Sequence, residues 1–335
     1  MSALSDVARL ADVSPATASR ALSGRGYVAA DTRDRVVAAA AEVGYFGTPS
    51  SAPVYPPSRS VGVVVPHVSR WYFGGVIEGI ESALAEAGFD LVLHRLTRDP
   101  LERRRTFETL LLRAGVSAVI AVGIESGDDV ASLLQPVDRP FVSVGGPVEG
   151  ATGLSIDDRA AGSLITRHLA SLGHQRIVHL GASDTGDAGL AVHASRLAGY
   201  RQAMSDAGLT ALVAVHTAPL SIPGGYAAGL AILADPRSRP TAIAAGSDEL
   251  AIGVIIAARQ LGIQVPDQLS VIGIDGHELA EMFALTTLAQ DPVAQGAEAV
   301  RLAVGEHSGP TSSQASTWIE QPARLVVRGS TRAPQ

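Results

Sequence analysis

Apolar strand-like runs alternate with amphipathic helix-like stretches through most of this chain, and that alternation limits the fold more than any other feature. The first round reads SVGVVVP, GGVIEGIESALAEAG, FDLVLHRL, a helical stretch near 102–113, and VSAVIAVG. The rhythm restarts near Ala160 and continues through RIVHLG, TAIAAG and LSVIGI. Because such alternation is typical of a parallel sheet with helices on both faces, the sequence predicts two doubly wound α/β lobes.

Residues 4–23 predict a separate, all-α unit. Four apolar residues recur at three- and four-residue spacing and indicate one amphipathic helix: Leu4, Val7, Ala8 and Ala11. The chain then turns at residues 12–13. Ser14 is a good N-cap and Pro15 suits the first helical position, so a second helix is predicted from Pro15 to Leu22.

The exposed side of this second helix suits the major groove of DNA. Small residues allow close approach to base edges, hydroxyls can contact phosphates, and Ala16 can meet a thymine methyl group. Arg20 can make the bidentate contact to guanine. The expected DNA-binding residues are Ser14, Pro15, Ala16, Thr17, Ser19, Arg20, Ser23 and Tyr27. A helical hairpin that binds no DNA is the alternative reading of the same spacing.

Motifs along nearly the whole chain resemble those of the lactose and galactose repressor family of bacterial transcriptional regulators. They include DVARLADVSPATASRAL (6–22), TRDRVVAAAAEVGY (32–45), LGHQRIVHLG (172–181), RLAGY (196–200) and VPDQLSVIGID (265–275). The resemblance implies a helix-turn-helix head with a third helix at 32–45. It also implies a periplasmic-binding-protein-like core, whose cleft holds a small effector that alters affinity for a double-stranded DNA operator.

The expected domains follow from the motifs and from a proline-rich gap. Residues 1–48 form the head, 49–60 a linker, and 61–335 the effector-binding and dimerisation core, with lobe 1 at 61–159 and 291–318 and lobe 2 at 160–290 and 319–329. The linker has prolines at 49, 53, 56 and 57. Each proline inside a helix costs about 3 kcal/mol, so we expect an extended strap rather than the hinge helix typical of the family, with Tyr55 or Arg59 as its groove contacts.

Side chains just beyond the strand ends are the candidates for the effector site, because ligands of such sheets bind there. The resemblance points to Trp71 and Phe73 as ring surfaces, and to Arg196 and Asp275 as a charged pair. Asp248 either lines the pocket or caps the next helix. The full expected set is Ser69, Trp71, Tyr72, Phe73, Arg196, Leu220, Asp248, Asp275 and Gln290.

The effector itself does not follow from the resemblance. Gly145 and Gly146 stand where many relatives have an aspartate, and Leu220 stands where several have an aromatic residue. Asp248 and Asp275 can accept hydrogen bonds from sugar hydroxyls and Arg196 can donate, so a mono- or disaccharide is favoured. A purine-like or phosphorylated metabolite is the alternative.

Composition and charge limit the classes of function that remain possible for this chain. The net charge is −7 and residues 1–48 hold five arginines and five acidic residues, so DNA affinity should depend on where the arginines point and on a homodimer doubling the contacts. There is no cysteine, and no metal-ligand spacing, phosphate loop or nucleophile elbow indicates a cofactor, a metal or an enzyme. The absence of a signal peptide, of membrane-length apolar runs and of C-terminal heptads favours a cytoplasmic dimer over a sugar-transport protein, with no tetramer-forming tail.

Overall fold

A computed structural model describes residues 3–23, 28–43, 59–97, 99–112, 116–124, 139–146, 148, 151–183, 190–305 and 317–335. The chain divides into two compact units, Met1–Ser58 and Arg59–Gln335, and each is treated by itself. The expected strap with Tyr55, the expected contact Tyr27 and the side chain of Ser23 lie outside the described residues. No helix in the described part of the chain is long and apolar enough to cross a membrane.

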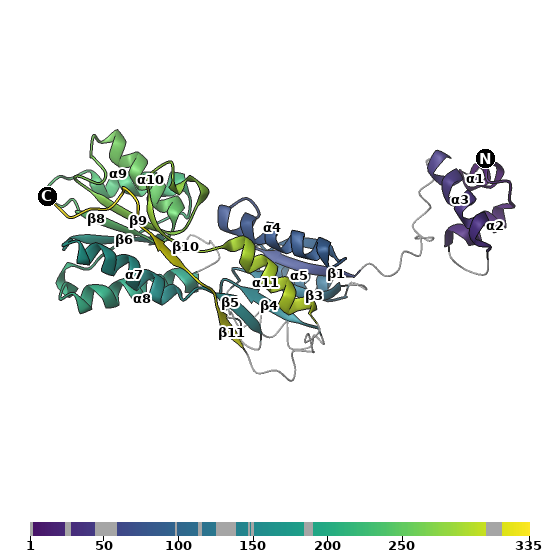
Figure 1. Ribbon diagram of the computed structural model, residues 1–335, viewed down its shortest axis with the longest axis horizontal. Helices are drawn as coiled ribbons and strands as arrows, with labels where there is room; N and C mark the ends of the chain where they lie inside the picture. Colours follow the sequence, from purple (N-terminus) through teal and green to yellow (C-terminus); the bar gives the residue numbers. More distant parts are fainter. Residues whose placement is uncertain are drawn as a thin grey trace. The chain divides into compact units, whose positions relative to one another are not determined.

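The first unit is a three-helix domain, drawn in purple in Figure 1. Its helices are α1 (Ala3–Leu10), α2 (Pro15–Ser23) and α3 (Ala30–Val43). The backbone N–H of Thr17 donates to Ser14 Oγ at 3.1 Å, which confirms the predicted cap of α2. Between α1 and α2 Asp12 has φ 53°, a left-handed conformation that aspartate tolerates better than most residues. The apolar sides of all three helices form one core, which includes Val7, Ala18 and Val36.

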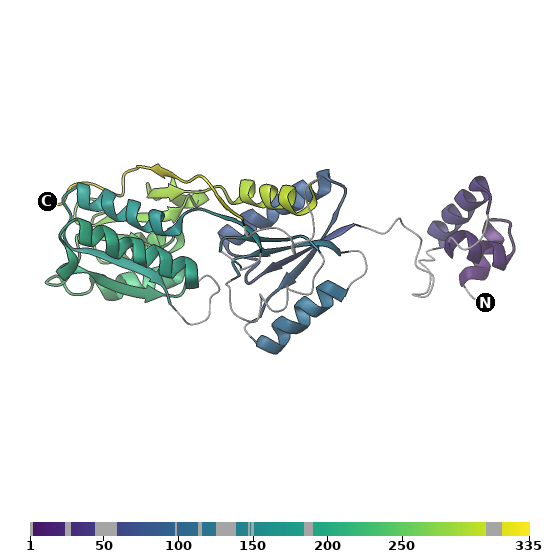
Figure 2. The ribbon, with the colours of Figure 1, turned by 90° about the horizontal axis from the view of Figure 1, so that it is seen from below.

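The second unit begins with a lobe built on a six-stranded sheet in the order β11-β5-β4-β3-β1-β2. Its strands are β1 (Ser60–Val65), β2 (Asp90–Arg95), β3 (Val116–Val122), β4 (Phe141–Val144), β5 (Thr152–Ser155) and β11 (Trp318–Glu320). All neighbouring pairs are parallel. Helices α4 (Trp71–Glu86) and α11 (Pro292–Val304) cover one face, and α5 (Pro100–Leu112) covers the other (Figure 2).

The second lobe repeats this architecture with the sheet order β12-β10-β9-β8-β6-β7. Its strands are β6 (Ile177–Ala182), β7 (Ala214–Ala218), β8 (Ala242–Ala245), β9 (Ser270–Asp275), β10 (Thr286–Ala289) and β12 (Arg324–Val326). Helices α7 (Asp158–Ser171) and α8 (Leu190–Asp206) pack on one face, and α9 (Ile222–Leu233) and α10 (Asp248–Gln260) on the other. The edge strand β12 pairs with β10 in antiparallel fashion; the other pairs are parallel.

The chain passes between the lobes three times, after β5, after β10 and after β11. Residues 319–320, which the sequence placed in the second lobe, pair with β5 of the first lobe because the indole of Trp318 fills the space beside Gly153. Asp158 and Arg159, expected at the end of the first lobe, begin α7 of the second. All three crossings leave the carboxyl ends of strands, which brings side chains of both lobes to one cleft.

Candidate functional site

A cavity lies between the two lobes and encloses about 710 Å³ of space not filled by protein atoms, part of it open to solvent. Seven of the residues expected from the sequence line it: Trp71, Tyr72, Phe73, Arg196, Leu220, Asp275 and Gln290. Ser69 does not, and it faces a neighbouring groove instead.

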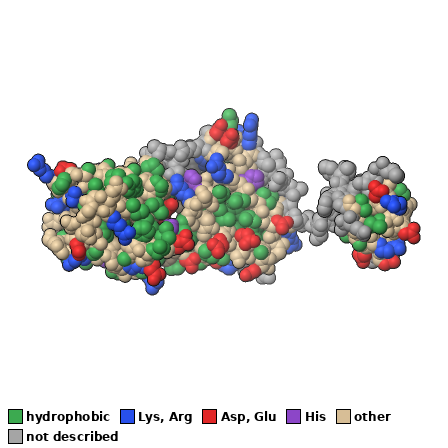
Figure 3. Space-filling model, turned by 90° about the horizontal axis from the view of Figure 1, so that it is seen from above, with side chains coloured by type: hydrophobic (Ala, Val, Ile, Leu, Met, Phe, Trp, Pro, Cys, Tyr) green, Lys and Arg blue, Asp and Glu red, His purple; other side chains and the backbone are tan. Residues whose placement is uncertain are grey.

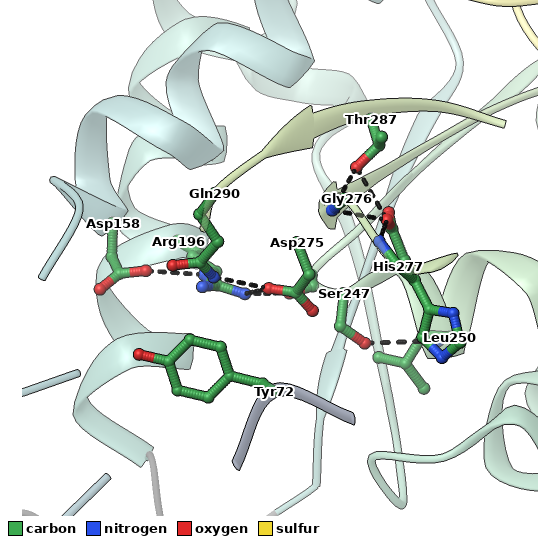
Figure 4. A network of polar contacts seen from close by, with 12 residues as sticks. Tyr72, Asp158, Arg196, Ser247, Leu250, Asp275, Gly276, His277, Thr287 and Gln290 are labelled. Carbon is green, nitrogen blue, oxygen red and sulfur yellow. Dashed lines mark hydrogen bonds and ion pairs between the residues drawn. The ribbon is translucent and has the colours of Figure 1, made fainter. Parts of the chain in front are cut away.

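Arg196 of α8 is the centre of the site, where it lies between two carboxylates (Figure 4). Its Nε donates to Asp158 Oδ1 at 2.8 Å, and its NH1 lies 3.7 Å from Asp275 Oδ1. NH1 also donates to the backbone oxygen of Gly246 at 2.5 Å. These contacts hold a guanidinium that is only 5% exposed. Its hydrogen bonds to described residues use Nε and NH1, and the residue lines the cavity.

Asp158, Arg196 and Asp275 form a row of charged side chains, and burial and charge have opposing effects on their pKa values. Desolvation raises the pKa of Asp275 to about 6, although Arg196 and the amide of Gln290 oppose the rise. Burial also raises the pKa of Asp158, again against the effect of Arg196. Burial would lower the pKa of Arg196, but the two carboxylates outweigh it and raise that pKa. The row therefore sets two carboxyl groups, both with raised pKa values, against one guanidinium whose pKa they raise.

Two glycines bring α7 and α8 close enough for the Arg196–Asp158 contact. A Cβ on Gly162 would lie 2.0 Å from the backbone oxygen of Arg196, and a Cβ on Gly199 would lie 2.0 Å from that of Arg159. No real Cβ approaches a backbone oxygen so closely, so any side chain at these positions forces the helices apart. The spacing of the two helices thus fixes the position of the guanidinium.

Asp248 has a role that neither sequence-based alternative anticipated. It does not line the cavity, and the cap of α10 is Ser247, whose Oγ accepts from the N–H of Leu250 at 3.3 Å. Asp248 is fully buried, and its Oδ2 accepts from the backbone N–H groups of Gly276 and His277 and from Thr287 Oγ1 at 2.8–2.9 Å.

These bonds hold the loop that follows β9. Asp275 has φ 130°, a strained conformation for an L-residue that persists only where its surroundings enforce it. The contacts of Asp248 to the next two backbone N–H groups supply that enforcement. The carboxylate of Asp275 is thereby aimed at Arg196, so Asp248 is a positioning residue for the site.

The three consecutive aromatic residues at the start of α4 differ in their surroundings. Trp71 stacks on His277 of the other lobe, with ring centroids 5.0 Å apart and planes inclined by 25°. Tyr72 donates its hydroxyl proton to Gln295 Oε1 at 2.7 Å. Phe73 is 7% exposed and belongs mainly to the core of the first lobe. Trp71 is therefore the ring most available to a ligand.

Asp158 and His193 are among the lining residues that were not anticipated. The doublet at 157–158 could have identified the first, because one aspartate caps α7 through the N–H of Ala160 and leaves the other for a different role. His193 precedes Arg196 by three residues and so lies on the same helix face. Burial lowers the pKa of His193 to about 3, and its Nδ1 has no hydrogen-bond partner among the described residues.

In the three-helix domain, α2 presents the surface expected to contact DNA. Four of its leading residues and Ser14 are exposed, while Thr17 is half-buried and shares a hydrogen bond with the Ser14 hydroxyl at 2.9 Å. The exposed residues of α2 are Pro15, Ala16, Ser19 and Arg20. The Nε of Arg20 donates to the backbone oxygen of Ala16 at 3.3 Å. The guanidinium therefore lies along the helix surface.

A head with an exposed second helix, joined to a two-lobed core with a polar cleft, defines a ligand-responsive DNA-binding protein. Residues 3–47 match the family model described as bacterial regulatory proteins, lacI family, and residues 166–331 match a periplasmic binding protein-like domain. The regulator DegA of Bacillus subtilis is 33% identical over 97% of each chain. MalR of Streptomyces coelicolor is 35% identical over 98% of this chain and 96% of its own.

Solved structures share the fold. A complex of the transcriptional regulator CelR with cellobiose has a TM-score of 0.67 at 27% identity, and it covers 98% of this chain and 99% of its own. The lac repressor dimer bound to operator has a TM-score of 0.73 at 24% identity, with 98% of both chains covered, and it shows the fold alone. The chain belongs to the lacI family of bacterial regulatory proteins and is a DNA-binding transcriptional regulator.

Proposed function

We propose that this regulator is a repressor whose operator affinity is controlled by a neutral sugar bound between the lobes. The observation that carries the proposal is the row of Asp158, Arg196 and Asp275 in a cavity that Trp71 also lines. Carboxylates accept hydrogen bonds from sugar hydroxyls, the guanidinium donates to them, and a ring covers the apolar face of a pyranose. The cellobiose bound by the related CelR is consistent with this class.

The charge of the row disfavours a phosphorylated ligand. Arg196 is already paired with two carboxylates, so a phosphate group near it would meet net negative charge at close range. A purine-like ligand is the second candidate, because Trp71 offers a flat ring and relatives named PurR are 29–32% identical over 87% of this chain. Its polar edge would need to use the same acceptors.

On DNA, α2 enters the major groove with Arg20 and Ala16 toward base edges and Ser14, Thr17 and Ser19 toward the backbone. Pro15, Ser23 and Tyr27 complete the proposed contact set. Two heads are needed, since the head carries no net positive charge to bind DNA as a monomer. We therefore propose a homodimer on a near-palindromic operator, acting in the cytoplasm and without a catalytic step.

The core has apolar surface for such a dimer. Exposed large hydrophobic side chains among the described residues include Leu93, Met282 and Val293, and apolar side chains gather on one face over both lobes (Figure 3). Large contiguous apolar patches on a protein surface mark sites of protein–protein contact, so we propose this face as the dimer contact.

The test combines DNA binding with a ligand panel. A genomic fragment selected by the purified protein is labelled, and anisotropy is followed while neutral sugars, nucleosides and sugar phosphates are added. We expect one neutral sugar to shift the affinity at least tenfold. Arg196→Lys, which keeps the charge but loses the forked donor geometry, should bind the fragment normally and lose the response. Failure to prefer any genomic fragment over scrambled DNA would overturn the regulator mechanism.

A further inference from the structure

Tyr72 is joined to the charged row by a chain of hydrogen bonds that crosses from one lobe to the other. Gln290 Nε2 donates to Asp275 Oδ1 at 2.9 Å, and Gln295 Nε2 donates to Gln290 Oε1 at 3.0 Å. The hydroxyl of Tyr72 then donates to Gln295 Oε1 at 2.7 Å. Gln290 and Tyr72 were expected from the sequence, whereas Gln295 was not; it is 1% exposed and lies on α11.

The carboxylate of Asp275 sets the donor and acceptor of every hydrogen bond in this series. A carboxylate can only accept, so Gln290 must turn its NH₂ group to Asp275 and its oxygen away. Gln295 must then turn its own NH₂ group to that oxygen, which leaves its Oε1 to Tyr72. An amide in the opposite orientation would place an oxygen against an oxygen in a buried site, where an unmade hydrogen bond is costly.

The hydroxyl of Tyr72 has one proton, and the chain commits that proton to Gln295. Burial and the carboxylates of Asp158 and Asp275 raise the pKa of Tyr72 well above its usual range, so the group stays protonated at any physiological pH. What it can still offer to another partner is a lone pair. In Figure 4, Tyr72 lies across from Arg196 and its flanking carboxylates.

The space beside this hydroxyl is kept free by a glycine. A Cβ on Gly145 would lie 3.1 Å from the Tyr72 oxygen, and Gly145 has φ 81°, a conformation that favours glycine. Both residues line the cavity. A small polar group of a ligand can therefore reach the oxygen where other residues would place a side chain.

We infer that Tyr72 is a specificity-determining hydrogen-bond acceptor, which selects a ligand carrying a hydroxyl or amino donor at that position and disfavours a phosphate, carboxylate or carbonyl oxygen. This inference rests on the proposed small-molecule function of the cavity and names the ligand chemistry that the cavity admits. Asp158, Asp275 and Tyr72 together present acceptors, and the guanidinium of Arg196 is the donor among them. The site is thus matched to a polyol and mismatched to an anion.

The test measures discrimination between neutral and anionic partners of the same skeleton. The probe pairs are ribose with ribose 5-phosphate, cellobiose with cellobionate, and adenosine with its 5′-monophosphate, titrated calorimetrically into the full-length protein at pH 8. Gln295→Leu removes the acceptor of the Tyr72 proton and frees that proton to donate into the cavity. Gln202→Leu, at an exposed position of α8, is the matched control, and thermal melts verify that both variants fold.

We expect at least one neutral probe to bind at least tenfold more tightly than its anionic partner, a factor equivalent to about 1.4 kcal/mol. In Gln295→Leu this ratio should shrink at least threefold, and in Gln202→Leu it should not change. Tyr72→Phe should weaken the neutral probe and leave its analogue deoxygenated at the contacting hydroxyl unaffected.

An anionic probe that binds as tightly as its neutral partner would overturn the inference, as would an unchanged ratio in Gln295→Leu or the absence of binding by every neutral probe. Operator binding by the same preparations reports separately on the regulator. If a neutral sugar releases the operator while Gln295→Leu keeps the wild-type ratio, the proposed function stands and only the role of Tyr72 fails.

Discussion

The indole of Trp71 stacks on the imidazole of His277, with their centroids 5.0 Å apart. Trp71 begins α4 of the first lobe, and His277 follows β9 of the second. Such ring pairs are worth about 0.5–1.5 kcal/mol beyond the area they bury, so this contact favours one arrangement of the lobes. Trp71 also lines the cavity. A ligand that changes the angle between the lobes must therefore preserve or break the stack of Trp71 on His277.

Trp71 should therefore report ligand binding. The chain has two tryptophans, and Trp318→Phe leaves Trp71 as the only indole. In that variant, we expect addition of the effector to change both the intensity and the wavelength of emission, because the imidazole neighbour moves. Trp71→Phe, which retains Trp318, is the control and should show little change. An unresponsive Trp71 under saturating effector would mean that the stack takes no part in switching.

A second prediction concerns the close contact of α7 and α8. Gly162→Ala places a Cβ 2.0 Å from the backbone oxygen of Arg196, so the helices must separate and the guanidinium moves relative to Asp158. We expect a loss of about 1–3 kcal/mol in the free energy of unfolding, typical of overpacking, together with a marked loss of effector affinity. Denaturant titration and calorimetry measure the two effects.

Gly74→Ala provides the contrast to that change. A Cβ on Gly74 meets no atom within 4 Å, and the residue lies inside α4. Alanine is favoured over glycine inside a helix by about 1 kcal/mol, so this variant should be more stable than the wild type and bind effector normally. Equal destabilisation by Gly74→Ala and Gly162→Ala would show that the close packing of α7 and α8 is not the cause of the stability loss in Gly162→Ala.

Most of the fold could be predicted from periodicity, since alternating strand and helix patterns dictate parallel sheets and the Ser14–Pro15 pair dictates the start of α2. The boundaries of the two lobes were harder to predict from the sequence. Residues 319–320 continue the pairing of Trp318 with β5 of the first lobe, where the ring of Trp318 lies beside Gly153. No local pattern indicates a contact between residues so far apart in sequence.

For the site, position after a strand end was a good guide to Asp275 and Gln290, which line the cavity. The position of a residue in the sequence did not distinguish the role of Asp248 from that of Asp275. Asp248 follows a strand as Asp275 does, yet its side chain turns to backbone N–H groups instead of the cavity. Asp158 is the first residue of α7, where acidic residues are expected for helix stability alone. The second role that the doublet at 157–158 allows becomes specific only through the contact with Arg196 in three dimensions.

The contribution of Arg20 to base recognition can be tested by Arg20→Ala. The side chain is exposed and contacts the Ala16 carbonyl, so its removal leaves the helix intact. We expect a loss of roughly 1–3 kcal/mol in specific binding and a relaxed preference at one base pair in each half-site. Arg9→Ala, which removes an exposed arginine paired with Asp6 on α1, serves as the control for loss of charge. Uniform weakening across all sequences by Arg20→Ala would assign it to a phosphate.

The last prediction uses the buried carboxyl of Asp248. Burial and the neighbouring charge of Asp275 raise its pKa from 3.8 to about 7, against the hydrogen bonds from Thr287, His277 and Gly276. Between about pH 4 and 7 the folded protein therefore holds a proton on Asp248 that the unfolded chain has released. Its contribution to stability is present at low pH and is lost as pH rises through 7, with a slope of up to about 1.4 kcal/mol per pH unit.

Asp248→Asn should remove this slope, because the amide oxygen can still accept the three bonds and no longer titrates. We expect the melting temperature of the variant to fall less steeply than that of the wild type between pH 5 and 7, measured by differential scanning calorimetry. Asp275, whose pKa is also raised, contributes a slope of its own in both proteins. Asp235→Asn, at an exposed carboxyl whose pKa is lowered by backbone and Ser238 hydrogen bonds, should follow the wild-type curve in this window. Parallel curves for Asp248→Asn and wild type would mean that Asp248 is ionised throughout the window, and the loop after β9 would then be held by a charged carboxylate.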